Sequence, residues 1–337
     1  MELYLDSANL KEIEEAFELG FLAGLTTTPT FMHREGVEDV DSLILKLADI
    51  VPILQIEALG ETAEEILAEA QRQLDMGLDI NKTVFKIPVS IEGVKACRML
   101  RNKGMMVNVH LVYTLQQAYM AMEAGATYVC PLVGRLQDQG HDALELVEAC
   151  VDAVNYYGYD TKIMFSSVRN AEHIRNGINI GVHTITVPWK IMKNLTENNF
   201  TTVGTDEFFE HTRMMTMKVK DIMSGVNPIV DTDMKLSDAI VKMTEFGFGA
   251  VTVQDLDGSV IGVFTDGDLR RKISENRDVL SMKMGEFDYN KPYAIEGEEL
   301  LNEAHNLFTK HQVDTLLITN KGQAVGMLDI QELEKNR

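Results

Sequence analysis

The sequence is poor in cysteine and has no long apolar run. Its 337 residues include three cysteines, and none of them lies in a C-x-x-C pair. Three cysteines are few and odd in number, which argues against a disulfide framework and is typical of a reducing compartment. The lack of a C-x-x-C pair argues against structural zinc. No apolar stretch approaches the roughly 20 residues of a membrane-spanning helix, and no signal-peptide pattern opens the chain. We therefore expect a cytoplasmic protein with no membrane partner and no metal.

Positive charge is also scarce. The chain has 31 Lys and Arg residues against 52 Asp and Glu residues, a net charge of −21. This excess of negative charge argues against nucleic acid and against an anionic membrane surface as main partners. A phosphate-bearing ligand would need a local cationic pocket, because the overall field repels it.

Residues 1–200 contain short apolar runs of strand length, separated by amphipathic stretches with helical spacing. Strands that alternate with helices predict a parallel sheet, and eight such units predict a closed (β/α)8 barrel, a TIM barrel. The alternative, a doubly wound open sheet, would normally carry G-x-G-x-x-G after its first strand, whereas this sequence has DSANLKEIEEA there. The eight predicted strands are 2–6, 22–27, 53–58, 84–89, 107–112, 127–132, 162–167 and 184–189.

The chain beyond about residue 213 contains an internal duplication. Segment 249–269 matches segment 313–333, and Gly258 of the first copy corresponds to Gly322 of the second. A strand-like segment and an amphipathic helix precede each copy, so we expect two copies of one α+β module. The predicted organisation is a barrel domain at 1–212, a linker at 213–218 and two modules at 219–278 and 279–337.

Lys86 lies in the middle of the apolar run 84–89. Strands of a parallel barrel are covered on both faces, so a charged lysine inside one is costly unless it is paired. Burial favours the neutral amine, which can attack a carbonyl carbon and form a Schiff base. The alternative is a structural lysine that pairs with a carboxylate at the strand's end. The strand alone leaves both interpretations open.

Polar side chains gather where the other predicted strands end. The carboxyl ends of barrel strands meet at the catalytic rim, so we expect these side chains to converge around Lys86. Single members have structural explanations, such as a helix cap for Asp6 or a surface ion pair for Arg169. The set as a whole predicts an active site. Its members are Asp6, Thr26, Thr28, Glu57, Lys86, His110, Arg135, Ser167 and Arg169.

The motifs LYLDSAN, GLTTTPT, FKIPVS, VNVHLVYTLQQA, GATYVCPLVGRLQD and SSVRN resemble the transaldolase family. The similarity is to its small-subunit branch, which includes fructose-6-phosphate aldolase, and it covers about residues 1–212 in matching order. It implies a class I aldol enzyme on a (β/α)8 barrel that acts on sugar phosphates through a lysine imine. No metal or organic cofactor is implied, and we expect a homo-oligomer.

The resemblance also implies a role for each matching position. Lys86 falls on the Schiff-base lysine. Asp6 falls on the aspartate that exchanges a proton with the hydroxyl next to the bond being cut, and Glu57 on the glutamate that assists Schiff-base formation. The implied substrate-holding positions are Arg135 and Arg169 for the acceptor's phosphate, with Thr26 and Ser167 on the donor side.

Several positions depart from the family's pattern. Thr28 replaces an asparagine that holds the donor's hydroxyls, and His110 replaces a threonine that positions the catalytic water. The hydroxyl of Thr28 cannot reproduce the donors and the acceptor of an amide. Together with His110, this change argues for a modified or non-standard ketose phosphate as the substrate. Leu132 stands where aldolases carry a catalytic tyrosine and transaldolases a phenylalanine. Trp189 replaces a proline and either walls the substrate pocket or lies half-buried under the barrel rim.

Glu57 and the absence of tyrosine at position 132 favour a transaldolase over a simple aldolase. We therefore expect the transfer of a ketol, dihydroxyacetone-like unit between a ketose phosphate and an aldose phosphate. Two alternatives stay open. A fructose-6-phosphate-type aldolase would release the three-carbon ketone without an acceptor, and a catalytically impaired barrel would only bind phosphosugar through Arg135 and Arg169.

Residues 219–337 resemble a pair of CBS domains through VKDIMSGVNPIVDTDMKLSDAIVKM and GVFTDGDLRR. The resemblance implies a regulatory adenine nucleotide in the cleft between the modules, with Asp268 on the ribose hydroxyls and Thr265 on a phosphate. The second copy has Asp329 and Glu332 at these positions, and an aspartate repels a phosphate. We expect at most one nucleotide site. The alternative is a pair that serves only for dimerisation.

Overall fold

The computed structural model describes residues 1–223 and 227–335 and forms two compact units, Met1–Glu197 and Asn198–Arg337. The motif at 219–243 and the second predicted module extend partly outside the described residues. Helix α11 (Asn199–Thr216) groups with the second unit, so the predicted linker at 213–218 begins inside a helix. The predicted domain limits stay a prediction.

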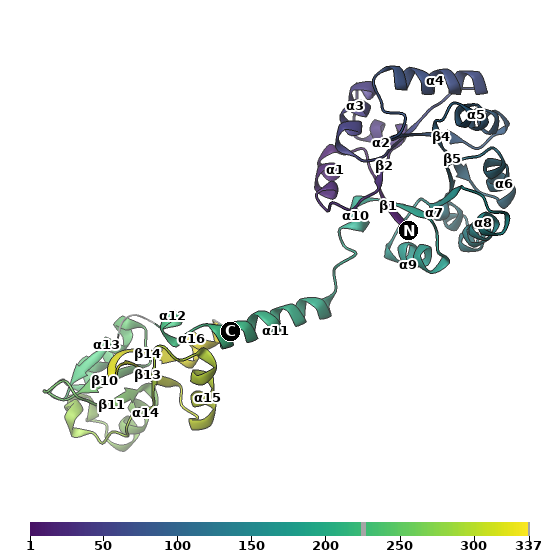
Figure 1. Cartoon of the computed structure of the whole chain (residues 1–337). Helices are drawn as coiled ribbons and strands as arrows, with labels where there is room; N and C mark the ends of the chain where they lie inside the picture. Colours follow the sequence, from purple (N-terminus) through teal and green to yellow (C-terminus); the bar gives the residue numbers. More distant parts are fainter. Residues whose placement is uncertain (224–226, 336–337) are drawn as a thin grey trace. The chain divides into compact units, whose positions relative to one another are not determined.

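The first unit is a closed barrel of eight parallel strands in chain order, which confirms the predicted (β/α)8 fold (Figure 1). Strand β1 pairs with both β2 and β8 and so closes the sheet. The strands are β1 (Glu2–Asp6), β2 (Gly24–Thr26), β3 (Leu54–Glu57), β4 (Thr83–Pro88), β5 (Met106–Val112), β6 (Tyr128–Pro131), β7 (Lys162–Phe165) and β8 (Thr184–Val187).

Helices surround the barrel, as the view in Figure 1 shows. Most of them begin at a polar residue whose side chain accepts a backbone N–H of the first turn, such as Thr62, which forms a reciprocal capping box with Glu65. The helices are α1 (Leu10–Phe17), α2 (Pro29–Arg34), α3 (Val40–Ile50), α4 (Ala63–Asp75), α5 (Ile91–Asn102), α6 (Leu115–Glu123), α7 (Val133–Asp138), α8 (Ala143–Tyr157), α9 (Ala171–Ile180) and α10 (Trp189–Met192).

The barrel strands are buried on both faces. In β4 the five residues from Thr83 to Ile87 are all buried, which explains why the strands appear in the sequence as continuous apolar runs. The outer face packs against the helices in one large apolar core. The inner face is partly polar: the amide of Asn108 on β5 donates a 2.7 Å hydrogen bond to Gln55 on β3, past the intervening strand β4. This polar filling lies on the same strands as the site described below.

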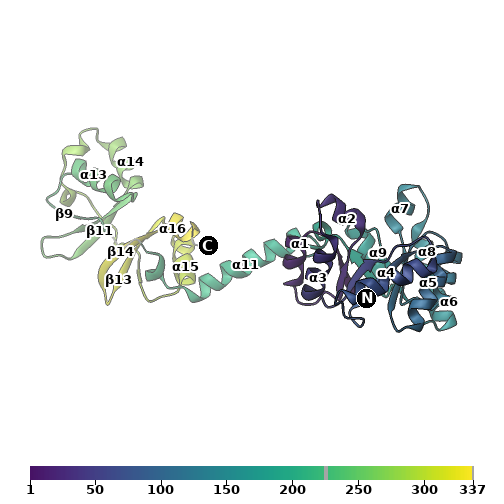
Figure 2. The same ribbon diagram turned by 90° about the horizontal axis from the view of Figure 1, so that it is seen from above.

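The second unit contains two three-stranded sheets of the same design, which confirms the predicted duplication (Figure 2). In each copy a strand and a helix precede a β-hairpin, and the hairpin turns place Gly258 and Gly322 at φ 85° and 80°. Its elements are α11, α12 (Val219–Ile222), β9 (Ile229–Asp231), α13 (Leu236–Phe246), β10 (Ala250–Gln254), β11 (Val260–Thr265), α14 (Asp266–Glu275), two 3-10 turns (Val279–Ser281 and Met284–Glu286), β12 (Ala294–Glu296), α15 (Leu301–His311), β13 (Thr315–Asn320), β14 (Gln323–Asp329) and α16 (Ile330–Lys335).

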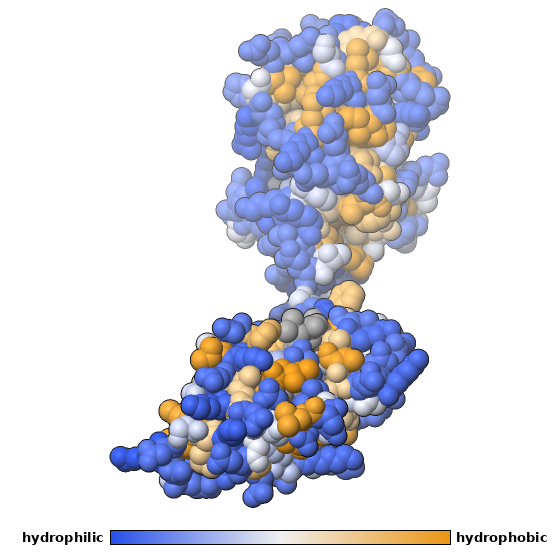
Figure 3. Space-filling view, turned by 90° about the vertical axis from the view of Figure 1, so that its left-hand side faces the viewer, coloured by the Kyte–Doolittle hydropathy of each residue, from blue (hydrophilic) through white to orange (hydrophobic). Residues whose placement is uncertain are grey.

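The surface mixes hydrophilic and apolar residues. Hydrophilic residues cover much of the face seen in Figure 3, and apolar residues lie between them in small groups. Within residues 1–223 and 227–335, no helix combines the length and the apolar character needed to cross a membrane.

Candidate active site

The predicted site residues of the first strands lie near the carboxyl ends of neighbouring strands. Asp6 ends β1 and lies opposite Thr26, which ends β2. Glu57 ends β3 and lies opposite Lys86 of β4. His110 lies opposite Pro88, further along the next strand, β5. Side chains expected to converge therefore do meet at the carboxyl ends of neighbouring strands.

Lys86, Glu57 and His110 form a buried group of charged and titratable side chains, here called the Lys86 cluster. Lys86 Nζ lies 3.0 Å from Glu57 Oε1, and both side chains are only 6% exposed. The same ammonium donates a 2.8 Å hydrogen bond to the main-chain oxygen of Thr27. His110 Nε2 lies 2.9 Å from Glu57 Oε2, but neither atom meets hydrogen-bond geometry. The imidazole is therefore close enough for an ion pair yet keeps an unsatisfied nitrogen.

The two carboxylates near Lys86 have opposite pKa shifts. Burial raises the pKa of Asp6, and this outweighs the charge of Lys86 and the hydrogen bond from Thr26. Burial also acts to raise the pKa of Glu57, but the charge of Lys86 and the contacts with His110 outweigh it and hold that pKa below its usual range. Glu57 is thus the more persistent anion, and Asp6 takes up a proton more readily.

Burial lowers the pKa of His110, and the positive charges of Lys86 and Arg135 act in the same direction. The nearby Glu57 opposes this shift without cancelling it. The imidazole is therefore biased towards its neutral form, in which one ring nitrogen donates and the other accepts.

An irregularity in β5 accompanies the placement of His110. The pairing of β5 with β6 shifts register between Val109 and Val112, and Leu111 lies in the left-handed region at φ 56°. Ser167, just after β7, has φ 61°. Left-handed residues other than glycine are uncommon and cluster at functional sites. A bulge of this kind redirects neighbouring side chains, and it was not predicted from the sequence.

The threonines of the GLTTTPT motif have distinct structural positions. Thr26 donates a 2.9 Å hydrogen bond to Asp6 and also shares a hydrogen bond with Thr186 of β8. Thr28 is the N-cap of α2, and its hydroxyl accepts the N–H of Phe31 at 3.3 Å. Sequence reasoning missed Thr27 and Thr186. The only signal for Thr186 was its place in the predicted strand 184–189.

Arg135 and Arg169 lie on adjacent segments. Arg135 is on α7 and donates to the hydroxyl of Tyr113 at 3.4 Å. Arg169 follows β7 and pairs with Asp138 at 3.0 Å. Helix α7 touches the loop after β7 so closely that a Cβ on Gly134 would lie 2.1 Å from the main-chain oxygen of Ser167 and 2.7 Å from Arg169 Nε. Arg135 and Arg169 are both exposed, and α7 brings Arg135 onto the segment that packs against Ser167 and Arg169.

Leu132 and Trp189 complete the predicted positions. Leu132 is buried in the apolar group that fills the barrel interior. Trp189 is half-buried, begins α10 and packs against the core between barrel and helices. Its indole Nε1 donates a 3.1 Å hydrogen bond to Glu15 on α1. This bond ties the indole to the helix layer, as in the structural alternative above, and its role as a pocket wall stays a prediction.

In the second unit, Thr265 and Asp268 line a cavity of about 950 Å3 together with Arg270, Arg271 and Lys272. The two motif residues form a capping box at the start of α14: Asp268 accepts from the Thr265 main-chain N–H at 2.9 Å and from its hydroxyl at 2.7 Å. Burial would raise the pKa of Asp268, but these bonds and Arg271 outweigh it and lower that pKa. The sequence did not reveal this structural role.

The second copy presents acidic groups to the same cavity. Asp329 and Glu332 both line it, and the Asp329 N–H donates to the Glu332 carboxylate at 3.3 Å. Cations of both copies line the cavity as well: Arg270, Arg271 and Lys272 on α14, and Lys291 and Lys335 of the second copy. A phosphate that approached the second motif itself would meet the repulsion of Asp329 and Glu332.

Comparison with known proteins agrees with these two units. The family described as Transaldolase/Fructose-6-phosphate aldolase matches residues 3–241, and the CBS domain family matches residues 219–275. "Probable transaldolase 2" of Bacillus anthracis is 35% identical over 215 residues, which are 62% of this chain and 96% of the relative. "Probable transaldolase" of Streptococcus equi subsp. equi is 38% identical over 212 residues, 62% of this chain and 97% of the relative.

A "Probable transaldolase" of a Thermoanaerobacter species is 37% identical over 221 residues, 65% of this chain and 100% of the relative. Among solved structures, a CBS-domain containing protein from Agrobacterium tumefaciens is 21% identical, with a TM-score of 0.34, over 36% of this chain and 92% of that chain.

Proposed function

Since the chain belongs to the transaldolase/fructose-6-phosphate aldolase family, we propose that its barrel transfers a ketol unit from a ketose phosphate to an aldose phosphate through an imine on Lys86. One observation carries the proposal: a buried lysine amine lies 3.0 Å from Glu57 at the carboxyl ends of the barrel strands. The opposite pKa shifts of Asp6 and Glu57 support separate roles for the two carboxylates.

The reaction begins with imine formation. The neutral amine of Lys86 attacks the carbonyl carbon of the ketose, a C–N bond forms, and the carbonyl oxygen leaves as water after proton transfers. We assign the exchange of those protons to Glu57, 3.0 Å from the amine, and to His110, 2.9 Å from Glu57. The resulting iminium withdraws electrons from the adjacent carbon–carbon bond.

Bond cleavage follows when Asp6 removes the proton of the hydroxyl next to the bond. The electron pair of that bond moves into the iminium, which leaves an enamine on Lys86 and frees an aldehyde. Burial, which raises the pKa of Asp6, makes it a stronger base for this step. In the second half-reaction the enamine attacks the acceptor aldehyde and Asp6 returns its proton. Water then hydrolyses the imine and restores the amine.

The substrates are held on either side of the Lys86 cluster. Arg135 and Arg169 offer charge-assisted contacts to the acceptor's phosphate and set its aldehyde against the enamine. Thr26 and Ser167 lie on the donor side. The Thr28 hydroxyl already caps α2, so it is a poor substitute for a donor-binding amide and supports a non-standard donor.

The second unit is proposed to regulate the barrel by binding one adenine nucleotide in its cavity. In this proposal Asp268 accepts from the ribose hydroxyls in exchange for its present contacts with Thr265 and Arg271, and Thr265 contacts a phosphate; both residues line the cavity together with Arg270. The acidic residues of the second copy disfavour a second phosphate there. The sign of the regulation depends on two global states of the chain.

Borohydride trapping tests the proposed chemistry. The protein is incubated with fructose 6-phosphate, sedoheptulose 7-phosphate and other ketose phosphates, reduced, and examined by intact and peptide mass spectrometry. We expect a donor-sized adduct on Lys86, lost in Lys86→Arg and kept in the control Lys82→Arg, whose lysine is exposed just before β4.

The product distribution separates the alternatives. Turnover that needs an aldehyde acceptor supports a transaldolase, whereas release of the free three-carbon ketone without an acceptor identifies an aldolase. If no ketose gives an adduct while calorimetry detects phosphosugar binding, the covalent mechanism is wrong and the barrel is a binding protein.

A further inference from the structure

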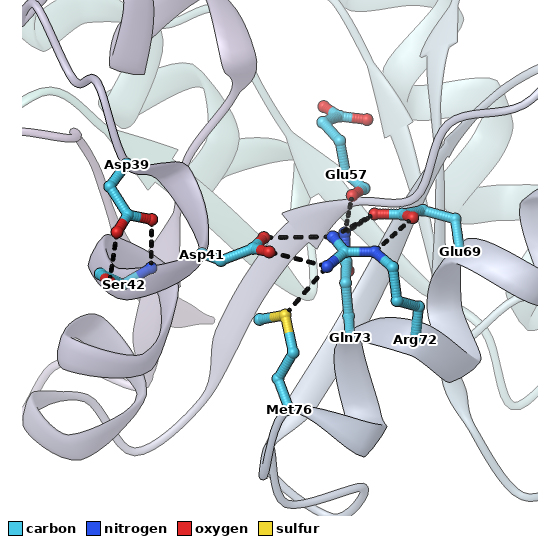
Figure 4. A network of polar contacts seen from close by, with 8 residues as sticks. All are labelled: Asp39, Asp41, Ser42, Glu57, Glu69, Arg72, Gln73 and Met76. Atoms are coloured by element: carbon cyan, nitrogen blue, oxygen red, sulfur yellow. Dashed lines mark hydrogen bonds and ion pairs between the residues drawn. The ribbon is translucent and has the colours of Figure 1, made fainter.

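Helix α4 turns one polar side chain towards the barrel among apolar ones. Its buried residues are Ala63, Ile66, Ala70 and Gln73, and Gln73 is 4% exposed. A buried amide is costly unless it is hydrogen-bonded. Gln73 Nε2 donates to the main-chain oxygen of Glu57 at 3.0 Å and to Glu69 at 2.7 Å (Figure 4). Both of its N–H groups are used, and one of them holds the end of β3.

The Glu57 carbonyl needs this donor because β2 stops pairing with β3 before Glu57 is reached. The pairing of β2 with β3 ends at Gln55, whose main-chain oxygen accepts the N–H of Thr27 at 3.2 Å. Two residues later the Glu57 oxygen points to the same side of β3, since hydrogen-bonding directions repeat every second residue in a strand. The chain of β2 has meanwhile turned into α2 at Pro29. The amide of Gln73 therefore replaces the missing strand neighbour.

Gln73 is itself fixed by an ion-pair network. Arg72 donates to Glu69 at 2.8 and 2.9 Å and to Asp41 of α3 at 2.7 and 3.1 Å (Figure 4). Glu69 in turn accepts from Gln73. The network connects the end of β3 to two surrounding helices, so the position of the Glu57 backbone does not depend on β4 alone.

From these contacts we propose that Gln73 is a positioning residue that sets the Glu57 carboxylate at its working distance from Lys86. The proposal rests on the proposed function for its catalytic consequence. A misplacement of about 1 Å in a catalytic group can cost on the order of 100-fold in rate. The side chain of Gln73 lies behind β3 and touches the main chain of Glu57, so it acts through that residue.

The test compares Gln73→Met with Gln71→Met. Both substitutions replace a glutamine of α4 by an unbranched side chain of similar length. Gln71, however, is exposed, and its amide donates to Asp75 at 2.9 Å on the same helix. Single-turnover trapping measures imine formation. We expect Gln73→Met to slow it by about 10-fold or more while the KM of the acceptor stays within about twofold, and Gln71→Met to leave both unchanged. Gln73→Lys, which keeps a donor at similar reach, should restore most of the rate.

A second readout does not need turnover. The NMR titration of His110 depends on the charges that face it, namely Glu57, Lys86 and Arg135. If Glu57 moves away, its favourable effect on the charged imidazole weakens and the pKa of His110 falls further. We expect this fall in Gln73→Met and not in Gln71→Met.

The two readouts separate the two proposals. If the wild-type chain forms no adduct with any ketose, the proposed function fails, and the His110 titration still decides whether Gln73 positions Glu57. If both Met variants leave the His110 titration unchanged, the positioning role is wrong. The same conclusion follows if Gln73→Met slows imine formation only in proportion to its unfolded fraction.

Discussion

Removal of the Lys86 charge should be costly to the barrel, and the structure sets the size of the effect. Lys86 Nζ and Glu57 Oε1 are 3.0 Å apart, which corresponds to a Coulomb energy of about 5 kcal/mol at an effective dielectric constant near 20. Breaking a buried pair by removing one partner typically costs about 3–5 kcal/mol. Lys86→Met also loses the hydrogen bond to the Thr27 oxygen, worth about 1 kcal/mol. Together these losses predict a decrease of about 4–6 kcal/mol in the free energy of unfolding.

A double-mutant cycle isolates the interaction. Glu57→Gln alone leaves the ammonium buried without its carboxylate, whereas the double variant removes both charges and should cost about 1–3 kcal/mol less than the sum of the single variants. Urea unfolding is followed by the fluorescence of Trp189, the chain's one tryptophan, which lies in the barrel unit. The signal therefore reports the barrel rather than the second unit.

The pH dependence gives an independent check. Burial, Lys86 and Arg135 lower the pKa of His110, so the wild-type barrel loses stability as pH falls through the range in which the unfolded-state histidine takes up a proton. In Lys86→Met one of these charges is gone and Glu57 lies 2.9 Å away, so the pKa of His110 is less depressed and this loss at low pH is smaller. The penalty should be smaller near about pH 5.5 than near about pH 8. The pairing of Lys86 with Glu57 would be refuted if the stability losses of the two single variants added up to that of the double variant within about 0.5 kcal/mol. Equal losses for Lys86→Met at both pH values would refute the role given to His110.

Three further predictions concern other parts of the chain. Because burial raises the pKa of Asp6, Asp6→Asn should stabilise the barrel at neutral pH and lose that advantage near about pH 4. The same variant should slow aldol cleavage by about 100-fold or more. An unchanged thermal unfolding temperature at neutral pH would contradict the stability prediction. Gly134→Ala places a Cβ 2.1 Å from the Ser167 oxygen, so it should cost about 1–3 kcal/mol and raise the acceptor's KM more than the donor's; equal changes in both KM values would argue against the arginine assignment. Asp268→Asn should weaken nucleotide binding in calorimetry by about 10-fold, and an unchanged Kd would remove Asp268 from that site.

The fold was predictable because burial on both faces leaves a strong signal in the sequence. The run 84–89 corresponds to β4 at Thr83–Pro88 and the run 184–189 to β8 at Thr184–Val187, so the strands were found to within about two residues at each end. The predicted end of the last strand runs past β8 because Pro188 and Trp189 continue the apolar composition beyond Val187. The helical start of the predicted linker was missed because α11 exposes most of its residues and carries a weak apolar pattern.

The Lys86 cluster was predictable because each member is a charged or polar side chain at the end of an apolar run. The contacts that position it were not. The Thr27 carbonyl accepts from Lys86 through the main chain, which carries no sequence signal. The hydrogen bond between Thr26 and Thr186 joins residues far apart in the chain. The bulge at Leu111 is a backbone conformation that the residue type does not predict.

The opposite pKa shifts of Asp6 and Glu57 follow from what surrounds each carboxylate rather than from residue type. Glu57 faces both Lys86 and His110 at about 3 Å, so two positively charged or chargeable groups offset its desolvation. Asp6 is compensated by the more distant Lys86 charge and the hydroxyl of Thr26, which is not enough. The charge of Lys86 therefore stabilises the Glu57 carboxylate more than the Asp6 carboxylate. Asp6, which is stabilised less, is the stronger base of the two. In the proposed mechanism the iminium forms on the same Lys86 nitrogen, so the difference in environment favours the proposed division, with proton transfer at the sugar hydroxyl by Asp6 and charge compensation at the nitrogen by Glu57.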